Sequence, residues 1–369
     1  MIGGTHRQML YLIARIDRAK FEPIVCTHLT SEGGLKEDFY SLNIKIYNLA
    51  RKSKFDISIF GKLRRILIDE NVSRIVIFEP QNLIYFRVAR LFMKTKIKQI
   101  GLLRAMGFWL GHKYPSLEFL DKLLADWMIR TSDAVIANSE SVKKYHLHNS
   151  KKYIKKIQVI YNVSDFNFPI NIDANAIRTS LGFSSKDFIS IMIARLDPWK
   201  DFYTLLKAAM LVTKTSKKIK FIICGGGELF QEVLSFINTN GLAQTVFLLG
   251  EKKNVYEYLN AADIMIHTTF GEGFSNAILE GLALKKTVLA SNVEANAEII
   301  GKNNEYGYLI PQGDYKTLSN IILELQGNCE LSTQVGLKGY ERIKELSDLK
   351  KNVKLYENIF TNVIEQLEE

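Results

Sequence analysis

Two glutamates eight positions apart, Glu272 and Glu280, lie in the segment of this sequence with the clearest potential for chemistry. Glycines flank Glu272 on both sides, and a backbone without side chains can approach a ligand closely. At ~1.5 Å per residue along a helix the two glutamates are roughly 12 Å apart, too far to share one proton. We therefore expect them to contact different parts of one extended ligand. The alternative is that they only complement a helix dipole.

The residues between the two glutamates open a helical pattern. The backbone N–H groups of Phe274, Ser275 and Asn276 then point outward from a helix N-terminus, a place that favours a phosphate. A second set of candidates, Arg195 and Lys200, follows an apolar run at 189–196. Arginine grips phosphate oxygens as a fork and lysine adds a point charge, although such residues in loops are usually only solvated.

Two glycine-rich turns complete the candidate set. One is the Gly-Gly-Gly-Glu turn at 225–228, and the other is the pair Gly3 and Gly4 at the start of a helical pattern. Neither has the lysine and hydroxyl residue of a P-loop or the full spacing of a dinucleotide fingerprint. Both indicate only a close approach of backbone to a ligand or to another segment.

These candidates must be positioned by alternating strands and helices, the pattern of parallel sheets flanked by helices. The expected strands are 21–29, 44–49, 73–78, 97–103, 133–139 and 157–162, followed by 189–196, 219–225, 246–250, 263–269 and 287–291. The expected helices are 4–16, 58–69, 117–130, 201–213, 228–239, 254–261, 275–284, 315–325 and 347–367. The polar stretch 164–187 separates the two series and is predicted to be a linker. The arrangement indicates two doubly wound domains with a crevice between them.

Composition is that of a globular protein with two cores: 369 residues, 47% hydrophobic and 24% charged. The chain has no apolar run of the ~18 residues that a membrane span needs, and no signal-peptide pattern, so we expect it to be cytoplasmic. Cys26 and Cys224 end apolar runs and are expected to be buried free thiols. Neither a zinc site nor a disulfide framework is expected.

The net charge of +10 is unevenly distributed. Residues 1–165 hold 28 lysines and arginines against 15 acidic residues, whereas the remainder holds 21 against 24. The basic half is expected to face something anionic, or to be simply a solvated basic surface. Nucleic acid is disfavoured because no nucleic-acid-binding motif accompanies the charge.

Taken in order along the chain, these features resemble the retaining glycosyltransferases of GT-B type, group 4 (GT4), which include many bacterial surface-polysaccharide enzymes. Their E-x7-E motif matches Glu272 and Glu280, and their R-x4-K pair matches Arg195 and Lys200. Their G-G-x-x-x-Q loop matches Gly3, Gly4 and Gln8. The resemblance covers nearly the whole chain and extends to 133–145, 225–228 and Glu298.

The resemblance implies a role for each matched residue. Glu272, Arg195 and Lys200 would be catalytic, the first at the donor sugar and the other two at the leaving diphosphate. Glu280 would hold the ribose. The remaining donor-binding positions would be Gly273, Phe274, Ser275, Asn276, Lys252, Gly3 and Gly4. Family members need no metal, so no metal and no cofactor other than the nucleotide-sugar substrate is expected.

Three departures from the family pattern concern the first half. Only Met1 and Ile2 stand before the Gly-Gly loop, so either the start is truncated or misassigned, or the first sheet lacks a strand. Ala105 occupies a position where some relatives have an aspartate, which leaves Arg104 and His112 as the acceptor-side candidates. The family's Y-N-G-V-D hinge here has Val163 in place of glycine.

The sequence thus predicts an α/β protein of two Rossmann-like domains facing across a cleft, with a C-terminal helix that crosses back to the first domain. The expected boundaries are 1–168 for an acceptor-binding domain, 169–345 for a nucleotide-sugar-binding domain and 346–369 for the returning helix.

The predicted function is transfer of a hexose from a UDP- or GDP-sugar to a glycan or lipid-linked precursor of cell-surface polysaccharide. Peripheral contact with an anionic membrane through 60–68 and 85–96 is expected at the inner face of the cytoplasmic membrane, although both segments also suit helices packed on their own sheet. The main alternative is a non-catalytic GT-B module that binds sugar nucleotide or supports a partner enzyme. An epimerase or phosphorylase on the same fold, and a Rossmann oxidoreductase, are further alternatives.

Overall fold

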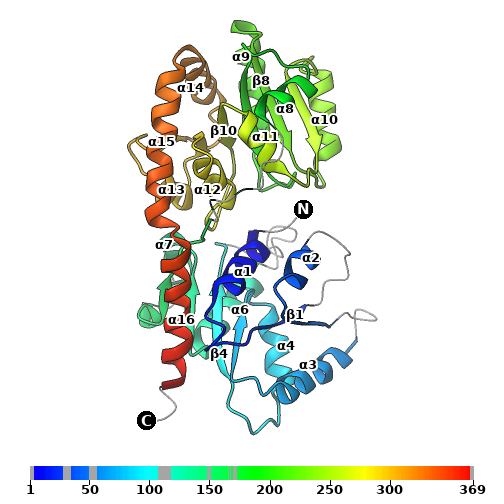
Figure 1. Cartoon of the computed structure of the whole chain (residues 1–369), viewed down its shortest axis with the longest axis vertical. Helices are drawn as coiled ribbons and strands as arrows, with labels where there is room; N and C mark the ends of the chain where they lie inside the picture. The colour runs from blue at the N-terminus through cyan, green and yellow to red at the C-terminus, as the bar shows by residue number, and fades with distance from the viewer. Residues whose placement is uncertain are drawn as a thin grey trace. The chain divides into compact units, whose positions relative to one another are not determined.

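The computed structural model describes residues 4–27, 35–49, 56–106, 118–147, 151–164, 166, 168 and 173–365. The chain divides into two compact units, one formed by Ile2–Val163 with Leu349–Glu369 and the other by Ser164–Asp348 together with Met1. Each unit has its own parallel sheets and its own core (Figure 1).

The first unit contains two parallel sheets. One pairs β1 (Ile24–Thr27) with β2 (Lys45–Asn48), and the other has the order β3 (Arg74–Ile77), β4 (Lys98–Leu103), β5 (Ala134–Ala137) and β6 (Ile157–Val159). Among the described residues no strand joins the two sheets, and α1 (Gly4–Arg15) is the first element. The expectation that an opening strand is missing therefore stays a prediction.

Helices cover both faces of the four-stranded sheet. On one face α3 (Ser58–Asp69), α4 (Asn82–Ala89), α6 (Glu118–Thr131) and α7 (Glu140–Leu147) share one apolar core with β3 to β6. On the other face α1 and the C-terminal helix α16 (Leu349–Glu365) share a second core with β4 and β5. The last helix thus completes the core of the unit in which the chain begins, as the red and dark blue helices of Figure 1 show. The short elements α2 (Leu35–Tyr40) and η2 (Lys151–Tyr153) complete this unit.

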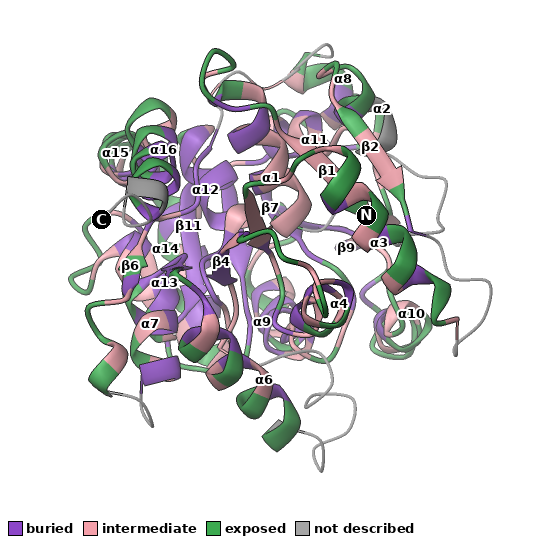
Figure 2. Ribbon diagram, turned by 90° about the horizontal axis from the view of Figure 1, so that it is seen from below, coloured by how far each residue is buried: buried purple, intermediate pink, exposed green. Residues whose placement is uncertain are grey.

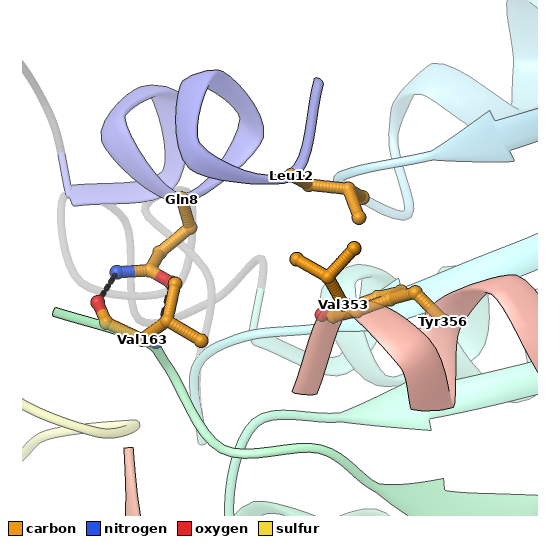
Figure 3. Close-up of a pocket in the computed structure, with 5 residues that line it drawn as sticks. All are labelled: Gln8, Leu12, Val163, Val353 and Tyr356. Atoms are coloured by element: carbon orange, nitrogen blue, oxygen red, sulfur yellow. Dashed lines mark hydrogen bonds between the residues drawn. The ribbon is translucent and has the colours of Figure 1, made fainter. Parts of the chain in front are cut away.

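Paired hydrogen bonds hold α1 to the chain that leaves β6. The Gln8 side chain donates from Nε2 to the Val163 carbonyl at 2.7 Å and accepts from the Val163 N–H at 2.8 Å (Figure 3). Both residues are buried, and Leu12, Val353 and Tyr356 line the small pocket beside them. The glutamine of the predicted Gly-Gly loop therefore ties helix to backbone within this unit.

The second unit has one six-stranded parallel sheet. Its order is β9 (Val246–Gly250), β8 (Ile219–Cys224), β7 (Phe188–Ile193), β10 (Ile264–His267), β11 (Thr287–Ser291) and β12 (Tyr308–Ile310). Numbered from the first strand of this unit, the order is 3-2-1-4-5-6, the doubly wound arrangement of Rossmann folds. Every residue of β7 and β10 is buried, because central parallel strands are covered on both faces.

Helices again lie on both faces of this sheet. One core joins it to α9 (Phe202–Thr215), α10 (Phe230–Thr239) and α14 (Tyr315–Gly327), and includes Ile264 and Ile266 of β10. Met265 points to the opposite face because side chains alternate along a strand, and α12 (Asn276–Ala283) packs there closely enough for Gly281 to adjoin its sulfur. The remaining helices are α8 (Ala174–Ser180), α11 (Val255–Ala261), α13 (Glu294–Ile300) and α15 (Cys329–Leu346).

Two expectations need correction. The stretch 164–187 is not wholly a linker, because α8 forms within it, capped by the Asp173 carboxylate, which accepts the Asn175 N–H. The polar residue Asp173, within this segment, acts as a helix cap rather than as part of a flexible connection. Cys26 is exposed, not buried, because its short strand β1 has only one partner, whereas Cys224 is buried as expected.

We predict that Gln8→Leu lowers the free energy of unfolding of the chain by about 2 kcal/mol, since it leaves the buried N–H and C=O of Val163 without their partners. Urea denaturation measures this effect. The matched control is Gln334→Leu, at an exposed glutamine on α15, which should change the unfolding free energy little. Equal effects of the two substitutions would contradict a structural role for the Gln8 pairing.

Candidate functional site

The candidate residues of the second unit gather at the point where its strand order reverses. Strands β7 and β10 are neighbours in the sheet, and helices follow them on opposite faces. Ligands of open α/β sheets bind beyond the carboxyl ends of the strands at such a switch point. The loop after β7 carries Arg195 and Lys200, and the loop after β10 carries Glu272.

Backbone hydrogen bonds join these two loops. Lys200 forms an isolated antiparallel bridge with Thr269, and the Phe270 N–H donates to the Trp199 carbonyl at 2.9 Å. The Thr269 hydroxyl also donates to the Trp199 carbonyl at 2.9 Å. This short ribbon brings the ammonium group of Lys200 to the carboxylate of Glu272 although 72 positions separate them in the chain.

The side chains of Lys200 and His267 both contact one carboxylate oxygen of Glu272. Glu272 Oε1 forms an ion pair with the Lys200 ammonium and lies 2.7 Å from His267 Nε2. The Ser275 hydroxyl lies 3.1 Å from the same ring nitrogen. The side chain of His267 is 2% exposed and that of Glu272 is 15% exposed, so the charges interact largely out of water.

Electrostatics hold this cluster in one protonation state at neutral pH. Burial alone raises the pKa of Glu272, but Lys200 and His267 outweigh it and lower the pKa to about 2. Burial lowers the pKa of His267, and the nearby positive charge of Lys200 acts in the same direction against the opposing effect of Glu272. Glu272 is therefore an anion and His267 a neutral imidazole.

The contacts also select the tautomer of His267. Its Nδ1 is buried and has no hydrogen-bond partner among the described residues. A proton on Nδ1 would leave a buried donor unsatisfied and turn the lone pair of Nε2 toward a carboxylate oxygen. A proton on Nε2 instead donates to Glu272, so we assign the Nε2–H form. His267 and Lys200 thus engage Oε1, while Oε2 of Glu272 has no partner in the described part of the chain.

Arg195 lies beside this cluster and faces solvent. Its guanidinium pairs with Asp197 at 2.9 Å, and its side chain is 57% exposed. The other carboxylate oxygen of Asp197 accepts the Trp199 N–H at 3.1 Å, which fixes the turn between Arg195 and Lys200. Both predicted phosphate-binding cations therefore have carboxylate partners in the ligand-free chain.

The glycine-rich turn 225–228 packs directly on the loop after β7. The Leu196 N–H donates to the Gly226 carbonyl at 2.9 Å, and the Leu229 N–H donates to the Leu196 carbonyl at 3.0 Å. A Cβ at Gly227, where φ is +149°, would lie 2.3 Å from the Leu196 carbonyl oxygen. Glycine is needed at this position for close backbone packing that supports the Arg195 loop.

The helix after Glu272 begins within one residue of its predicted start. Helix α12 starts at Asn276, and Ser275 caps it by accepting the Ile278 N–H at 3.3 Å. Glu272 lies before the helix and Glu280 lies within it, so the expectation that they contact different parts of one ligand stays a prediction. Glu280 is buried within α12, and Gly273 and Phe274 are buried in the turn.

The other predicted positions are spread over both units. Lys252 lies in the turn after β9 with its ammonium 5.6 Å from the centre of the Tyr258 ring. Gly4 is the first residue of α1, and Arg104 follows β4 in the same unit. Arg104 donates to the Asn162 side chain at 2.6 Å and also interacts with Tyr356 of α16, while burial lowers its pKa. Gly3 and His112 lie outside the described residues.

His267 is the one member of the cluster that sequence reasoning missed. It stands at the end of an apolar strand run, where a single histidine is indistinguishable from a core residue. The available signal was its position directly before the loop that carries Glu272. Within the described ranges, no group of three or more histidine, cysteine, aspartate or glutamate side chains is placed to hold a metal ion.

Two family models match almost the whole chain between them. Residues 2–168 match the model described as Glycosyltransferase Family 4, and residues 173–342 match the model described as Glycosyl transferases group 1. The two matches meet where the chain passes from one unit to the other.

Curated relatives and solved structures are similar over most of the chain. N-acetyl-alpha-D-glucosaminyl L-malate synthase of Bacillus anthracis is 25% identical over 88% of this chain and 84% of its own. UDP-Gal:alpha-D-GlcNAc-diphosphoundecaprenol alpha-1,3-galactosyltransferase of Escherichia coli is 24% identical over 90% of this chain and 83% of its own. HepE of Anabaena, solved with UDP-glucose, aligns with a TM-score of 0.83 at 18% identity over 98% of this chain and 97% of its own. The predicted two-domain GT-B fold is thus confirmed.

We predict that the Glu272 carboxylate stabilises the fold only where it is ionised. Its folded pKa of about 2 lies below the ordinary 4.5, so the stabilisation is present above pH 4.5 and is lost as the pH falls toward 2. The difference in unfolding free energy between the wild type and Glu272→Gln should shrink by about 2–3 kcal/mol over this range. Urea denaturation from neutral pH downward measures it.

The control is Glu305→Gln, at an exposed glutamate of the same unit, a surface substitution that should change the free energy of unfolding little. A wild-type to Glu272→Gln difference that stays constant as the pH falls would show that Lys200 and His267 do not hold the carboxylate in its ionised form.

Proposed function

Because the chain belongs to the family 4 glycosyltransferases, with a group 1 glycosyltransferase half after residue 172, we propose that it transfers a hexose from a UDP- or GDP-linked donor. The acceptor is a saccharide or lipid-linked precursor in cell-surface polysaccharide synthesis. The observation that carries the proposal is the Lys200–Glu272–His267 cluster at the switch point of the second sheet.

Glu272 is the residue suited to the donor sugar. An ionised carboxylate accepts hydrogen bonds from hydroxyl groups, and such charge-assisted bonds are stronger than neutral ones. Lys200 and His267 hold Oε1, so Oε2 is the atom that meets the sugar. Because the side chains of Lys200 and His267 are 16% and 2% exposed and the Lys200 loop is bridged to Thr269, the carboxylate is positioned before the ligand arrives.

The cations and the helix start beside Glu272 suit the donor diphosphate. Arg195 offers a forked donor toward solvent, and Lys200 lies within the same loop. In this proposal the diphosphate draws Arg195 away from Asp197 and contacts Lys200, which stays paired with Glu272, and backbone N–H groups at 274–276 contribute at the N-terminus of α12. The negative charge that develops on the leaving diphosphate is stabilised by these groups without a metal ion.

Glu280 and Lys252 suit the nucleoside part of the donor. Glu280 is buried on α12 and has the carboxylate chemistry that suits ribose hydroxyls, and Lys252 lies in the turn after β9. No cofactor other than the sugar nucleotide enters the proposal.

We further propose that transfer retains the anomeric configuration of the sugar. Glu272, the only carboxylate assigned to the sugar, is engaged by two partners through one oxygen and is suited to orientation rather than to attack. A reaction on one face, in which the acceptor hydroxyl enters on the side from which the diphosphate leaves, is compatible with these residues.

The acceptor side is assigned to the first unit. The names of the Escherichia coli and Campylobacter jejuni relatives describe transfer to sugars on diphosphoundecaprenol. By analogy we propose a lipid-linked acceptor here, with Arg104 and His112 as candidates for its recognition. None of the described helices is both long and apolar enough to cross a membrane. We propose a cytoplasmic location with peripheral contact at the inner membrane face.

We predict that Glu272→Gln lowers the rate of sugar transfer by about 100-fold, because a neutral amide weakens the hydrogen bonds to the sugar that position it in the transition state. Transfer from the donor identified for this chain is measured with and without a chelator, and the anomeric configuration of the product is read by NMR. The same configuration in donor and product, and a rate unchanged by the chelator, are expected.

The matched control is Glu305→Gln, which should transfer at the wild-type rate. A Glu272→Gln variant with full activity would refute the assignment of the site. Inversion of configuration would refute the proposed retention, and loss of activity with the chelator would refute metal independence. A folded wild-type protein that binds a sugar nucleotide but transfers nothing would favour a non-catalytic binding module.

A further inference from the structure

Exposed apolar side chains concentrate on one side of the first unit. Of the fifteen large hydrophobic side chains that are exposed in the described part of the chain, eight lie on α4, the turn after it, or α6. Phe92 is 91% exposed, more than any other of them. On α6, Phe119, Leu123 and Trp127 recur every fourth residue and therefore form one stripe along the helix.

The two helices belong to one layer. Both pack on the same face of the four-stranded sheet through a shared core, and the Arg87 guanidinium donates to the Thr131 carbonyl at the end of α6 at 3.0 Å. Figure 2 shows exposed residues along α6. We call the exposed residues of this layer the α4–α6 surface, which comprises Val88, Leu91, Phe92, Phe119, Leu123 and Trp127.

Basic residues accompany the apolar ones on this surface. Between positions 82 and 98 the chain has five lysines and arginines and no acidic residue. Lys94 and Lys96 are exposed directly after Phe92, and Lys122 and Arg130 are exposed on α6. Apolar side chains interleaved with cations are the composition that anchors a protein at the interface of an anionic bilayer.

The same charges disfavour the other occupants of an apolar surface. Charged residues are depleted from the centre of protein–protein interfaces, yet here they alternate with the apolar side chains. A second copy of this chain paired face to face would bring identical cations together in one interface, which opposes association. A lipid surface accepts the apolar groups and neutralises the cations.

We propose that the α4–α6 surface docks on an anionic lipid bilayer, with Phe92 and the α6 stripe entering the interface and the basic residues contacting headgroups. Phe92, Lys94 and Lys96 lie in the turn that leads from α4 into the start of β4, at the amino edge of the parallel sheet, whereas ligands of α/β folds bind at the carboxyl edge. The docking therefore does not depend on the proposed function.

Vesicle cosedimentation of the full chain tests the proposal. Vesicles of phosphatidylcholine with about 30% phosphatidylglycerol should bind the wild type at low ionic strength, and binding should fall when salt shortens the Debye length. Pure phosphatidylcholine vesicles should bind it weakly. Lys94→Glu with Lys96→Glu should weaken binding about tenfold or more. Phe92→Ser with Leu123→Ser should weaken it comparably at every salt concentration.

Matched controls carry the same changes on other surfaces. Lys217→Glu with Lys218→Glu, at exposed lysines of the second unit, and Leu355→Ser with Leu337→Ser, at exposed leucines of α16 and α15, should leave vesicle binding within about twofold of wild type. Sedimentation velocity without lipid should show a monomer.

The proposal would be overturned if the control variants lost as much vesicle binding as the variants of the α4–α6 surface, or if the wild type did not bind anionic vesicles. A dimer that Phe92→Ser with Leu123→Ser converts to a monomer would instead assign the surface to self-association. Sugar-nucleotide binding, measured in solution on the same proteins, separates the membrane-docking proposal from the proposed function. A wild type that binds no sugar nucleotide would count against the proposed function. A wild type that binds a sugar nucleotide but no anionic vesicles would count against the docking surface alone.

Discussion

The ion pair between Lys200 and Glu272 is the interaction on which the proposed donor-sugar site depends. Burial alone would raise the pKa of this carboxylate and disfavour its charged form. With Lys200 and His267 bound to one oxygen it stays ionised, and a charged, oriented acceptor faces the place where a donor sugar would lie. The surrounding structure keeps these three side chains in contact with one another.

Backbone contacts between the loops, rather than the side chains themselves, fix the positions of the three side chains. The bridge between Lys200 and Thr269 fixes the two loops to each other, and Gly227 allows a third loop to pack against Leu196. Each loop follows a fully buried parallel strand, which is a rigid base. Carboxylates pair with both cations of this site, Asp197 with Arg195 and Glu272 with Lys200. In the proposed donor complex, diphosphate oxygens would replace Asp197 at Arg195, whereas Lys200 would stay paired with Glu272.

Much of this could be predicted from the sequence. Strands such as 189–196 and 263–269 are runs of β-branched and apolar residues, so their positions in the chain were correct to within two residues at most ends. The short strand Tyr308–Ile310 was missed because three residues carry no periodicity. Helix α8 was missed because its polar sequence suggested a linker, although Asp173 marks its start.

The site itself was predictable only as a set of residues. Its members other than His267 were recognised one by one, but the pairing of Lys200 with Glu272 depends on β7 and β10 being neighbours, which no local pattern reveals. His267 was missed because a single histidine at the end of an apolar strand run is indistinguishable from a core residue. Gln8 and Arg104 were recognised, but not their partners Val163 and Asn162, which lie far along the chain.

The most direct test of this account is calorimetric titration of the wild type and Glu272→Gln with UDP-glucose, UDP-galactose, UDP-GlcNAc, GDP-mannose and the bare nucleotides UDP and GDP. The account predicts that one sugar nucleotide binds the wild type more tightly than its bare nucleotide does. It also predicts that Glu272→Gln loses this advantage while its affinity for the bare nucleotide falls no more than about threefold. An advantage for the sugar that survives unchanged in Glu272→Gln would contradict the claim that this carboxylate, held by Lys200 and His267, is the donor-sugar site.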